Sequence, residues 1–257
     1  MMRLLASALL LAAAPAAADR VIDLSHAYDA DTVYWPTESG FVLEKKHDGV
    51  TAAGYYYAAN RFCSPEHGGT HLDAPVHFGK DRRAVDAIPV SQLIGPGVVI
   101  DVTDACARDR DYQVRVDDIV AWERQHGKIP RGAIVFLRTG FGRFWPDRVR
   151  YMGTAERGAA AVAKLHFPGL APDAARFLAV ERRIGAVGID TPSIDHGPST
   201  TFATHVLLSE HEVPALENVA NLEPLPARGF TAIALPMKIR GGSGGPVRIV
   251  AVLSDAR

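Results

Sequence analysis

A chain of 257 residues, 47% of them hydrophobic, is long enough to bury a sizeable core, and we expect one domain rather than two. The 28 Lys and Arg residues nearly balance the 29 Asp and Glu residues, and no block of like charges stands out. Because phosphate binding needs a concentrated basic surface, we expect no nucleic-acid partner.

Residues 1–18 have the features of a secretory signal peptide. Arg3 provides a positive charge, residues 4–14 form an apolar run interrupted only by Ser7, and residues 16–18 are three alanines that suit a cleavage site. Spanning a bilayer takes about 20 apolar residues, so this run is too short for a membrane anchor. We expect a mature domain of residues 19–257 that is exported, periplasmic or secreted, with no membrane association after cleavage.

Strand-like and helix-like segments are mixed along the mature chain. The predicted strands, chosen for β-branched and aromatic residues between turn signals, are 21–24, 54–62, 98–102, 133–139, 186–189, 230–239 and 247–253. The predicted helices are 117–126, 172–183 and about 201–211. Because no repeat or linker divides them, the sequence predicts a single mixed α/β domain.

Two features near these elements have ordinary explanations. The glycine-rich segment 241–246 lies between two predicted strands and lacks the Lys and following helix of a phosphate-binding loop, so a tight turn or bulge accounts for it. Cys63 and Cys106 are too few for a disulfide scaffold, and whether they pair stays open. Cys63 could be a nucleophile or soft ligand, but we expect a small buried residue of a strand.

The segment 67–77, His-Gly-Gly-Thr-His-Leu-Asp-Ala-Pro-Val-His, concentrates residue types that bind metals. Its candidates are His67, His71, Asp73 and His77. A fully extended strand would spread these four over roughly 33 Å, whereas ligands sit about 2 Å from an ion. Gly68, Gly69 and Pro75 permit or enforce turns. The sequence therefore predicts a loop or curled strand that folds around an ion.

Each of these residues also has an ordinary interpretation. Thr70 and Asp73 could cap a short helix, and single histidines usually lie in the core or on the surface. Imidazole with carboxylate is nevertheless the usual ligand set for zinc or manganese. The density of the four residues favours a divalent-metal site, with zinc preferred and manganese as the alternative.

The same segment resembles the signature of the cyclase family that includes bacterial kynurenine formamidase, a His, Gly-Thr-His, Asp-Ala-Pro, His run. The likeness covers nearly all of the mature chain. Its other parts are residues 22–26, the stretch Tyr34-Trp35-Pro36, residues 188–195, His205 and residues 216–218.

The resemblance implies a ligand set for one or two metal ions. His67, His71 and Asp73 would bind one ion, and His205 would bind a second. Asp73 and Glu217 would bridge the two. These five residues are all present without substitution.

The resemblance also assigns two residues that do not bind metal. His77 would donate and accept protons, and Trp35 would contact an aromatic substrate. A bound metal lowers the pKa of its water toward about 7, and a second metal roughly 3.5–4 Å away can polarise a carbonyl. An imidazole with a pKa of about 6.5 can then carry the proton of that water to the leaving nitrogen.

Other polar residues near the motifs are weaker candidates. Glu66, Asp190 and Asp195 could orient ligand imidazoles or make turn hydrogen bonds. The sequence assigns no role to His196, which directly follows Asp195. We expect the histidines without a partner pattern to be solvated, namely His47, His126, His166 and His211.

The resemblance implies the family's swivelling β/β/α fold, an α/β single domain with a mixed sheet and flanking helices, assembled as a homodimer or larger oligomer. It implies a metal-dependent amidohydrolase for a small aromatic amide, with arylformamidase activity on N-formyl-kynurenine as the leading hypothesis. Opening of a cyclic amide such as isatin is the alternative. Export argues against a simple role in tryptophan catabolism.

Two hypotheses come from other classes. A non-catalytic periplasmic protein that binds a metal or ligand would have no use for a proton shuttle at His77. A thiol hydrolase that uses Cys63 would keep its activity after chelation.

Overall fold

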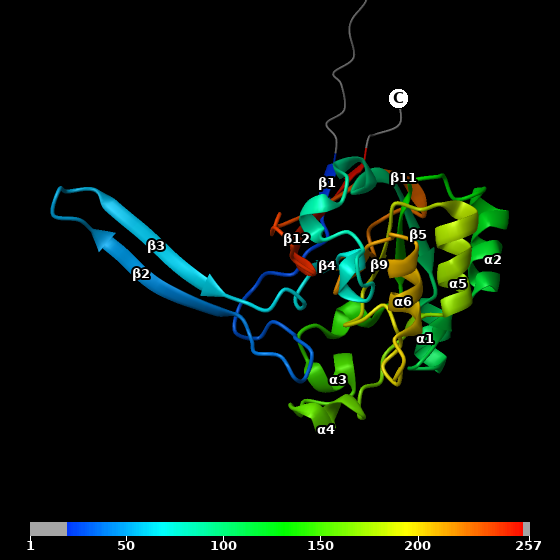
Figure 1. Ribbon diagram of the computed structural model, residues 1–257, viewed down its shortest axis with the longest axis horizontal. Helices are drawn as coiled ribbons and strands as arrows, with labels where there is room; N and C mark the ends of the chain where they lie inside the picture. The colour runs from blue at the N-terminus through cyan, green and yellow to red at the C-terminus, as the bar shows by residue number, and fades with distance from the viewer. Residues whose placement is uncertain (1–19, 254–257) are drawn as a thin grey trace, which may run out of the picture.

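The main sheet has eight strands and curls back on itself (Figure 1). The computed structural model describes residues 20–253, so the predicted signal segment lies outside the described residues. The strands run in the order β1 (Arg20–Asp23), β12 (Gly244–Leu253), β11 (Arg228–Pro236), β5 (Ile94–Asp101), β7 (Ile134–Arg138), β9 (Ala186–Ile189), β10 (Ala215–Glu217) and β4 (His71–Asp73). Because the end strand β4 also pairs with β12, the strand next to the other end, the sheet closes on itself.

The central strands β5, β7 and β9 are parallel; β7 and β9 are almost fully buried, and β5 is buried from Gly97 to Ile100. Their side chains alternate between two apolar cores, as the period of two in a strand requires. Val98 and Ile100 face one core, and Val99 between them faces the other. The helices cover the first core, and the curled sheet encloses the second.

Helices cover one face of this sheet (Figure 1). They are α1 (Thr103–Arg108), α2 (Val116–His126), α5 (Pro172–Arg176), a π-helix (Phe177–Arg182) that continues α5, and α6 (Ala203–Glu210). Two further short helices, α3 (Arg148–Met152) and α4 (Ala159–Val162), lie below the sheet in this view. Short 3-10 helices occur at Pro75–His77, Val85–Ala87, Val90–Gln92 and Phe141–Phe144. Ile119 of α2, Ala174 of α5 and Leu207 of α6 all enter the core beneath the helices.

A two-stranded arm projects from the body, built from β2 (Val42–Val50) and β3 (Tyr56–Cys63) (Figure 1). Both of its faces are largely exposed. A second small sheet pairs β6 (Gln113–Val114) with β8 (Gly169–Leu170).

The single mixed α/β domain expected from the sequence is confirmed. Each predicted helix and strand overlaps an observed one. The elements that were not predicted are the strands β2, β4, β6, β8 and β10 and the short helices α1, α3 and α4. The expectation that Cys63 is buried is wrong: it ends β3 on the projecting arm, where the body does not cover it. Both cysteines are free, and only Cys106 is buried. Among the described residues, no helix has the length and apolar character needed to cross a membrane.

Candidate active site

The segment 67–77 forms a loop, a short strand and a 3-10 helix, which confirms the prediction of a curled path. Two glycines permit the loop. A Cβ at Gly68 would lie 2.1 Å from Cδ1 of Tyr34, and Gly69 has a φ of +57°, in the left-handed region. After this turn β4 carries His71 and Asp73 into the interior, where both are buried.

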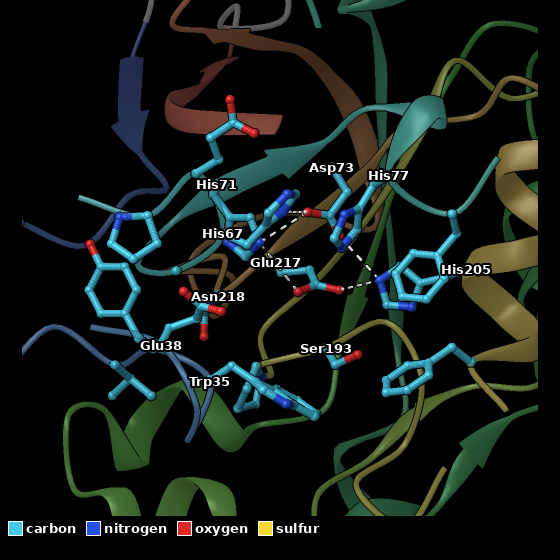
Figure 2. Close-up of a pocket in the computed structure, with 18 residues that line it drawn as sticks. Trp35, Glu38, His67, His71, Asp73, His77, Ser193, His205, Glu217 and Asn218 are labelled. Carbon is cyan, nitrogen blue, oxygen red and sulfur yellow. Dashed lines mark hydrogen bonds and ion pairs between the residues drawn. The ribbon is translucent and has the colours of Figure 1, made fainter. Parts of the chain in front are cut away.

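Two other elements bring His205 and Glu217 to the same place. Strand β10 pairs antiparallel with β4, and its register sets Glu217 opposite His71. His205 comes from the first turn of α6. The side-chain atoms that could bind a metal fall into two groups, and the atoms of each group lie within 4.8 Å of one another (Figure 2). The two groups share the carboxylate of Asp73. The groups are His67, His71 and Asp73, and Asp73, His205 and Glu217.

Asp73 lies at the centre of this cluster. Its Oδ1 is 2.5 Å from Nδ1 of His67 and 3.1 Å from Nε2 of His71. Its Oδ2 is 3.2 Å from Nε2 of His205, and that nitrogen lies 3.1 Å from Oε1 of Glu217. One carboxylate therefore faces three imidazole rings, as expected of a residue shared by two sites.

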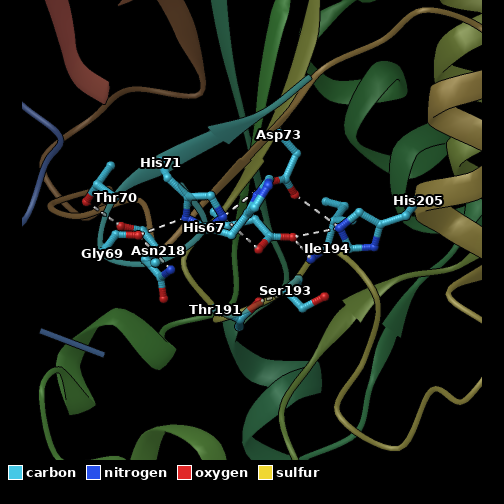
Figure 3. A network of polar contacts seen from close by, with 12 residues as sticks. His67, Gly69, Thr70, His71, Asp73, Thr191, Ser193, Ile194, His205 and Asn218 are labelled. Atoms are coloured by element: carbon cyan, nitrogen blue, oxygen red, sulfur yellow. Dashed lines mark hydrogen bonds and ion pairs between the residues drawn. The ribbon is translucent and has the colours of Figure 1, made fainter. Parts of the chain in front are cut away.

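The second ring nitrogens of His71 and His205 contact acceptors outside the cluster, and Figure 3 shows His71 beside Gly69 and Asn218. Nδ1 of His71 lies 3.0 Å from the carbonyl of Gly69, which also accepts from the amide of Asn218 at 2.7 Å. Nδ1 of His205 lies 2.7 Å from Oδ2 of Asp195. Because these acceptors take an N–H, they leave the Nε2 atoms to face the carboxylates, which is how ligand histidines are usually oriented.

Of the three acidic residues expected near the ligands, Asp195 has the orienting contact. Asp190 instead accepts the backbone N–H groups of Thr139 and Gly140, as in the turn alternative. Glu66 reaches the cluster only through a serine, described below. His196 belongs to neither ligand group.

The pKa values of the two buried carboxylates are shifted in opposite directions. Burial alone would raise the pKa of Asp73, but the nearby His71 and His67 outweigh it and hold that pKa well below its usual range. Burial and the charge of Asp73 together raise the pKa of Glu217. Two carboxylates side by side resist double ionisation unless positive charge is added.

The adjacent imidazoles respond to that negative charge. Burial alone would lower the pKa of His71, but Asp73 and Glu217 raise it to about 9. Burial alone would also lower the pKa of His205. Its hydrogen bonds to Asp195, Asp73 and Glu217 outweigh burial and raise that pKa. The cluster thus gathers positive charge as protons on its rings.

These features fit a divalent cation. The cluster combines imidazole nitrogen with carboxylate oxygen, the donor set preferred by zinc and manganese. No Lys or Arg is among the described residues that line the surrounding pocket. A cation bound between the rings and carboxylates would replace the protons that otherwise balance the two acidic groups.

His77 lies beside this cluster without belonging to either ligand group. It ends the 3-10 helix Pro75–His77, and its ring stacks on that of His67 with a centroid separation of 3.7 Å. Its ring centroid is 6.0 Å from that of His205. Burial lowers the pKa of His77 to about 4, so the ring is neutral at about pH 7 and free to accept a proton.

A cavity of about 430 Å³ opens over the cluster (Figure 2). Trp35, Phe78 and Phe202 line its aromatic part, and the rings of Trp35 and Phe202 lie 6.2 Å apart. Glu38 and Glu66 are its remaining acidic lining residues outside the cluster. The pocket therefore offers aromatic surface and negative charge to a bound molecule.

The structure brings together every residue of the predicted site. His67, His71, Asp73, His77, His205, Glu217 and Trp35 all line this one pocket. Cys63 is not among the lining residues. Sequence reasoning missed Phe78, Phe202 and Ser243; for Phe78 the signal was its position directly after the motif.

Comparisons with known proteins agree with this geometry. A family model described as "Putative cyclase" matches residues 22–196. An isatin hydrolase from Roseibium aggregatum is 36% identical over 211 residues, 79% of this chain and 78% of that protein. A kynurenine formamidase from Bacillus mycoides is 28% identical, over 89% of this chain and 95% of that protein.

A solved structure of an isatin hydrolase bound to the product analogue thioisatinate has a TM-score of 0.82 at 30% identity, with 92% of this chain and 93% of that chain covered. The family match spans well over half of the chain, and the fold and the buried His, Asp and Glu cluster are consistent with it. This chain belongs to the cyclase family of metal-dependent hydrolases.

Proposed function

We propose that the protein hydrolyses the amide bond of a small, neutral aromatic amide, with an isatin-type cyclic amide preferred over N-formyl-kynurenine. The position of His77 carries the proposal of catalysis. This ring is neutral, reaches the pocket, and stands outside both ligand groups, so it is available for proton transfer. A protein that only bound a metal would not need it.

The residues divide the work between holding the metal and moving protons. His67, His71, Asp73, His205 and Glu217 would hold one or two divalent ions. A bound ion lowers the pKa of water and polarises a carbonyl oxygen. His77 would accept a proton from the attacking water and deliver it to the leaving nitrogen, while Trp35 stacks against the aromatic ring.

The charge of the pocket favours a neutral substrate. N-formyl-kynurenine carries an amino-acid ammonium and carboxylate, and among the described lining residues no Lys or Arg is present to pair with the carboxylate. Glu38 and Glu66 could pair with the ammonium but would repel the carboxylate. Isatin has no carboxylate until its ring opens. The greater identity to the isatin hydrolase supports the same choice.

Arylformamidase activity is the second candidate, supported by the similarity to kynurenine formamidase over 95% of that protein. Purified protein should be assayed against isatin, N-formyl-kynurenine and an uncharged formanilide, before and after chelation. We expect metal-dependent hydrolysis of isatin and formanilide and weaker hydrolysis of N-formyl-kynurenine. Absence of metal-dependent hydrolysis with all three would contradict the proposal.

We also propose zinc as the preferred ion, with manganese as the alternative, because the donor set suits both. Export to the periplasm or beyond follows from the signal-like residues 1–18. A homodimer or larger oligomer is supported by the exposed arm, where Val50, Tyr55 and Tyr56 are 60% exposed or more. An isolated two-stranded ribbon is only marginally stable, so packing of this arm against a second copy would stabilise it.

A further inference from the structure

The glycine-rich connection between β11 and β12 reaches the metal-binding cluster. Ser243, the last residue before β12, has its Oγ 2.8 Å from Nε2 of His67. The same Oγ lies 2.5 Å from Oε2 of Glu66, and the backbone N–H of Ser243 donates to that oxygen at 2.9 Å. One serine thus links Glu66 and His67, although it lies 176 residues from the histidine.

The direction of these hydrogen bonds follows from the chemistry of the groups. A carboxylate only accepts, so the hydroxyl of Ser243 donates its proton to Glu66. Its oxygen then accepts from Nε2–H of His67. This places a ring proton of His67 on Nε2. Nδ1 lies 2.5 Å from Oδ1 of Asp73, which only accepts, so a bound ion would take the place of an Nδ1–H between these two atoms.

The neighbouring glycines lie against the same two side chains. A Cβ at Gly242 would lie 2.7 Å from Oε1 of Glu66, and a Cβ at Gly244 would lie 2.5 Å from the carbonyl oxygen of Leu72 and 2.6 Å from Cε1 of His67. These separations are too short for real contacts. At Gly245, by contrast, the nearest atom would be 3.4 Å away, an ordinary contact. The connection therefore requires small residues on both sides of Ser243.

We propose that Ser243, oriented by Glu66, is a positioning residue that selects the tautomer and ring orientation of His67. This inference rests on the metal-binding role proposed for His67. His67 is the most exposed member of the ligand groups and has no buried acceptor like Gly69 or Asp195, so its orientation depends on this serine. Because His77 stacks on His67, the same contact also supports the proton carrier.

The test compares zinc affinity, measured by chelator competition, in Ser243→Ala, Glu66→Gln and His67→Ala proteins. We expect Ser243→Ala to weaken zinc binding about 10- to 100-fold, as loss of a partner that orients a ligand does. Glu66→Gln should have a smaller effect, since the amide oxygen still accepts from Ser243. This variant also keeps the test decisive if Ser243→Ala fails to fold.

Ser25→Ala is the matched control. Ser25 is a half-buried serine whose hydroxyl donates to the carbonyl of Ile249 and accepts its N–H, away from the cluster. Its removal should lower thermal stability without changing zinc affinity. Equal losses of zinc affinity in Ser25→Ala and Ser243→Ala would overturn the inference.

A spectroscopic readout separates positioning from general stability. In zinc-loaded protein labelled with ¹⁵N, we expect a hydrogen-bonded Nε2–H signal that is absent from His67→Ala and lost or shifted in Ser243→Ala. Wild-type zinc affinity in Ser243→Ala, or a spectrum showing the proton on Nδ1, would overturn the role of Ser243 and leave the metal-binding role of His67 intact. Unchanged zinc binding in His67→Ala would instead remove the ligand role of His67, and the inference with it.

Discussion

The imidazole rings of His67 and His77 lie nearly parallel, with centroids 3.7 Å apart and planes inclined by 18°. Only His67 belongs to a group able to hold a metal ion. The proposed ligand His67 and the proposed proton carrier His77 therefore stack on each other while having different proposed tasks. Their separation into two roles leads to the first prediction.

We expect His77→Ala to retain its metal and to lose about 10²- to 10⁴-fold in kcat, the usual contribution of general acid and base catalysis. Metal content and kcat should be measured on the same preparation. The control is His71→Ala, in which loss of a buried imidazole should empty or weaken the site. A metal-depleted His77→Ala protein whose activity returns with added zinc would instead make His77 a ligand.

Removal of the metal should abolish hydrolysis, and zinc or manganese should restore it, because the ion would activate the attacking water and no Lys or Arg is among the described lining residues to polarise the carbonyl in its place. The measurement is activity against metal content during chelation and reconstitution. Cys63→Ala should be fully active, since Cys63 lies on the arm outside the pocket. Activity that survives chelation but not the Cys63→Ala substitution would identify a thiol hydrolase.

A cation at the pocket wall should shift the substrate preference. Glu38→Lys should raise kcat/KM for N-formyl-kynurenine relative to isatin by about 2- to 5-fold, the worth of an exposed ion pair of up to about 1 kcal/mol. Glu38→Gln should produce a smaller change, because it removes repulsion without adding attraction. An unchanged ratio in Glu38→Lys would show that the carboxylate binds elsewhere.

The stability of the domain should depend on pH through Glu123 and Arg182. The guanidinium donates to both carboxylate oxygens, at 2.6 and 2.8 Å, and lowers the pKa of Glu123. A lowered folded pKa contributes stability above the unfolded value of about 4.3, and that stability is lost as pH falls through the folded pKa.

Glu123→Gln should therefore lower the free energy of unfolding at about pH 7 by about 1.5–3 kcal/mol, with a smaller difference at about pH 3. Urea titrations at both pH values measure this. In the control, Glu156→Gln, the ion pair to Lys164 is exposed and the loss should stay below about 1 kcal/mol. A Glu123→Gln effect independent of pH would contradict the linkage.

The sequence also predicts that the exported chain begins at Asp19, after the three alanines 16–18. Mass spectrometry of protein recovered from the periplasm or medium measures its N-terminus. An exported protein that keeps Met1 or Met2 would contradict cleavage at this point.

Local sequence was enough to predict the parts of the site that lie close together in the chain. The glycines at 68 and 69 allow the turn that brings His67 back toward Asp73, and residue type alone marked these side chains as ligands. Helix α2 could also be predicted, because its acidic start and the glycine after its end are local signals.

Only the tertiary structure decided what lies around those ligands. Strand β10 has three residues, too few for a periodic signal, and its position depends on pairing with β4 and β9. Asp195 and Asp190 cannot be told apart by the sequence around them. In the structure Asp195 contacts the ring of His205, whereas Asp190 accepts a backbone N–H in a turn. Ser243 reaches His67 across 176 residues because β12 pairs with β4. Such contacts arise from strand pairing between distant segments, which local composition does not encode.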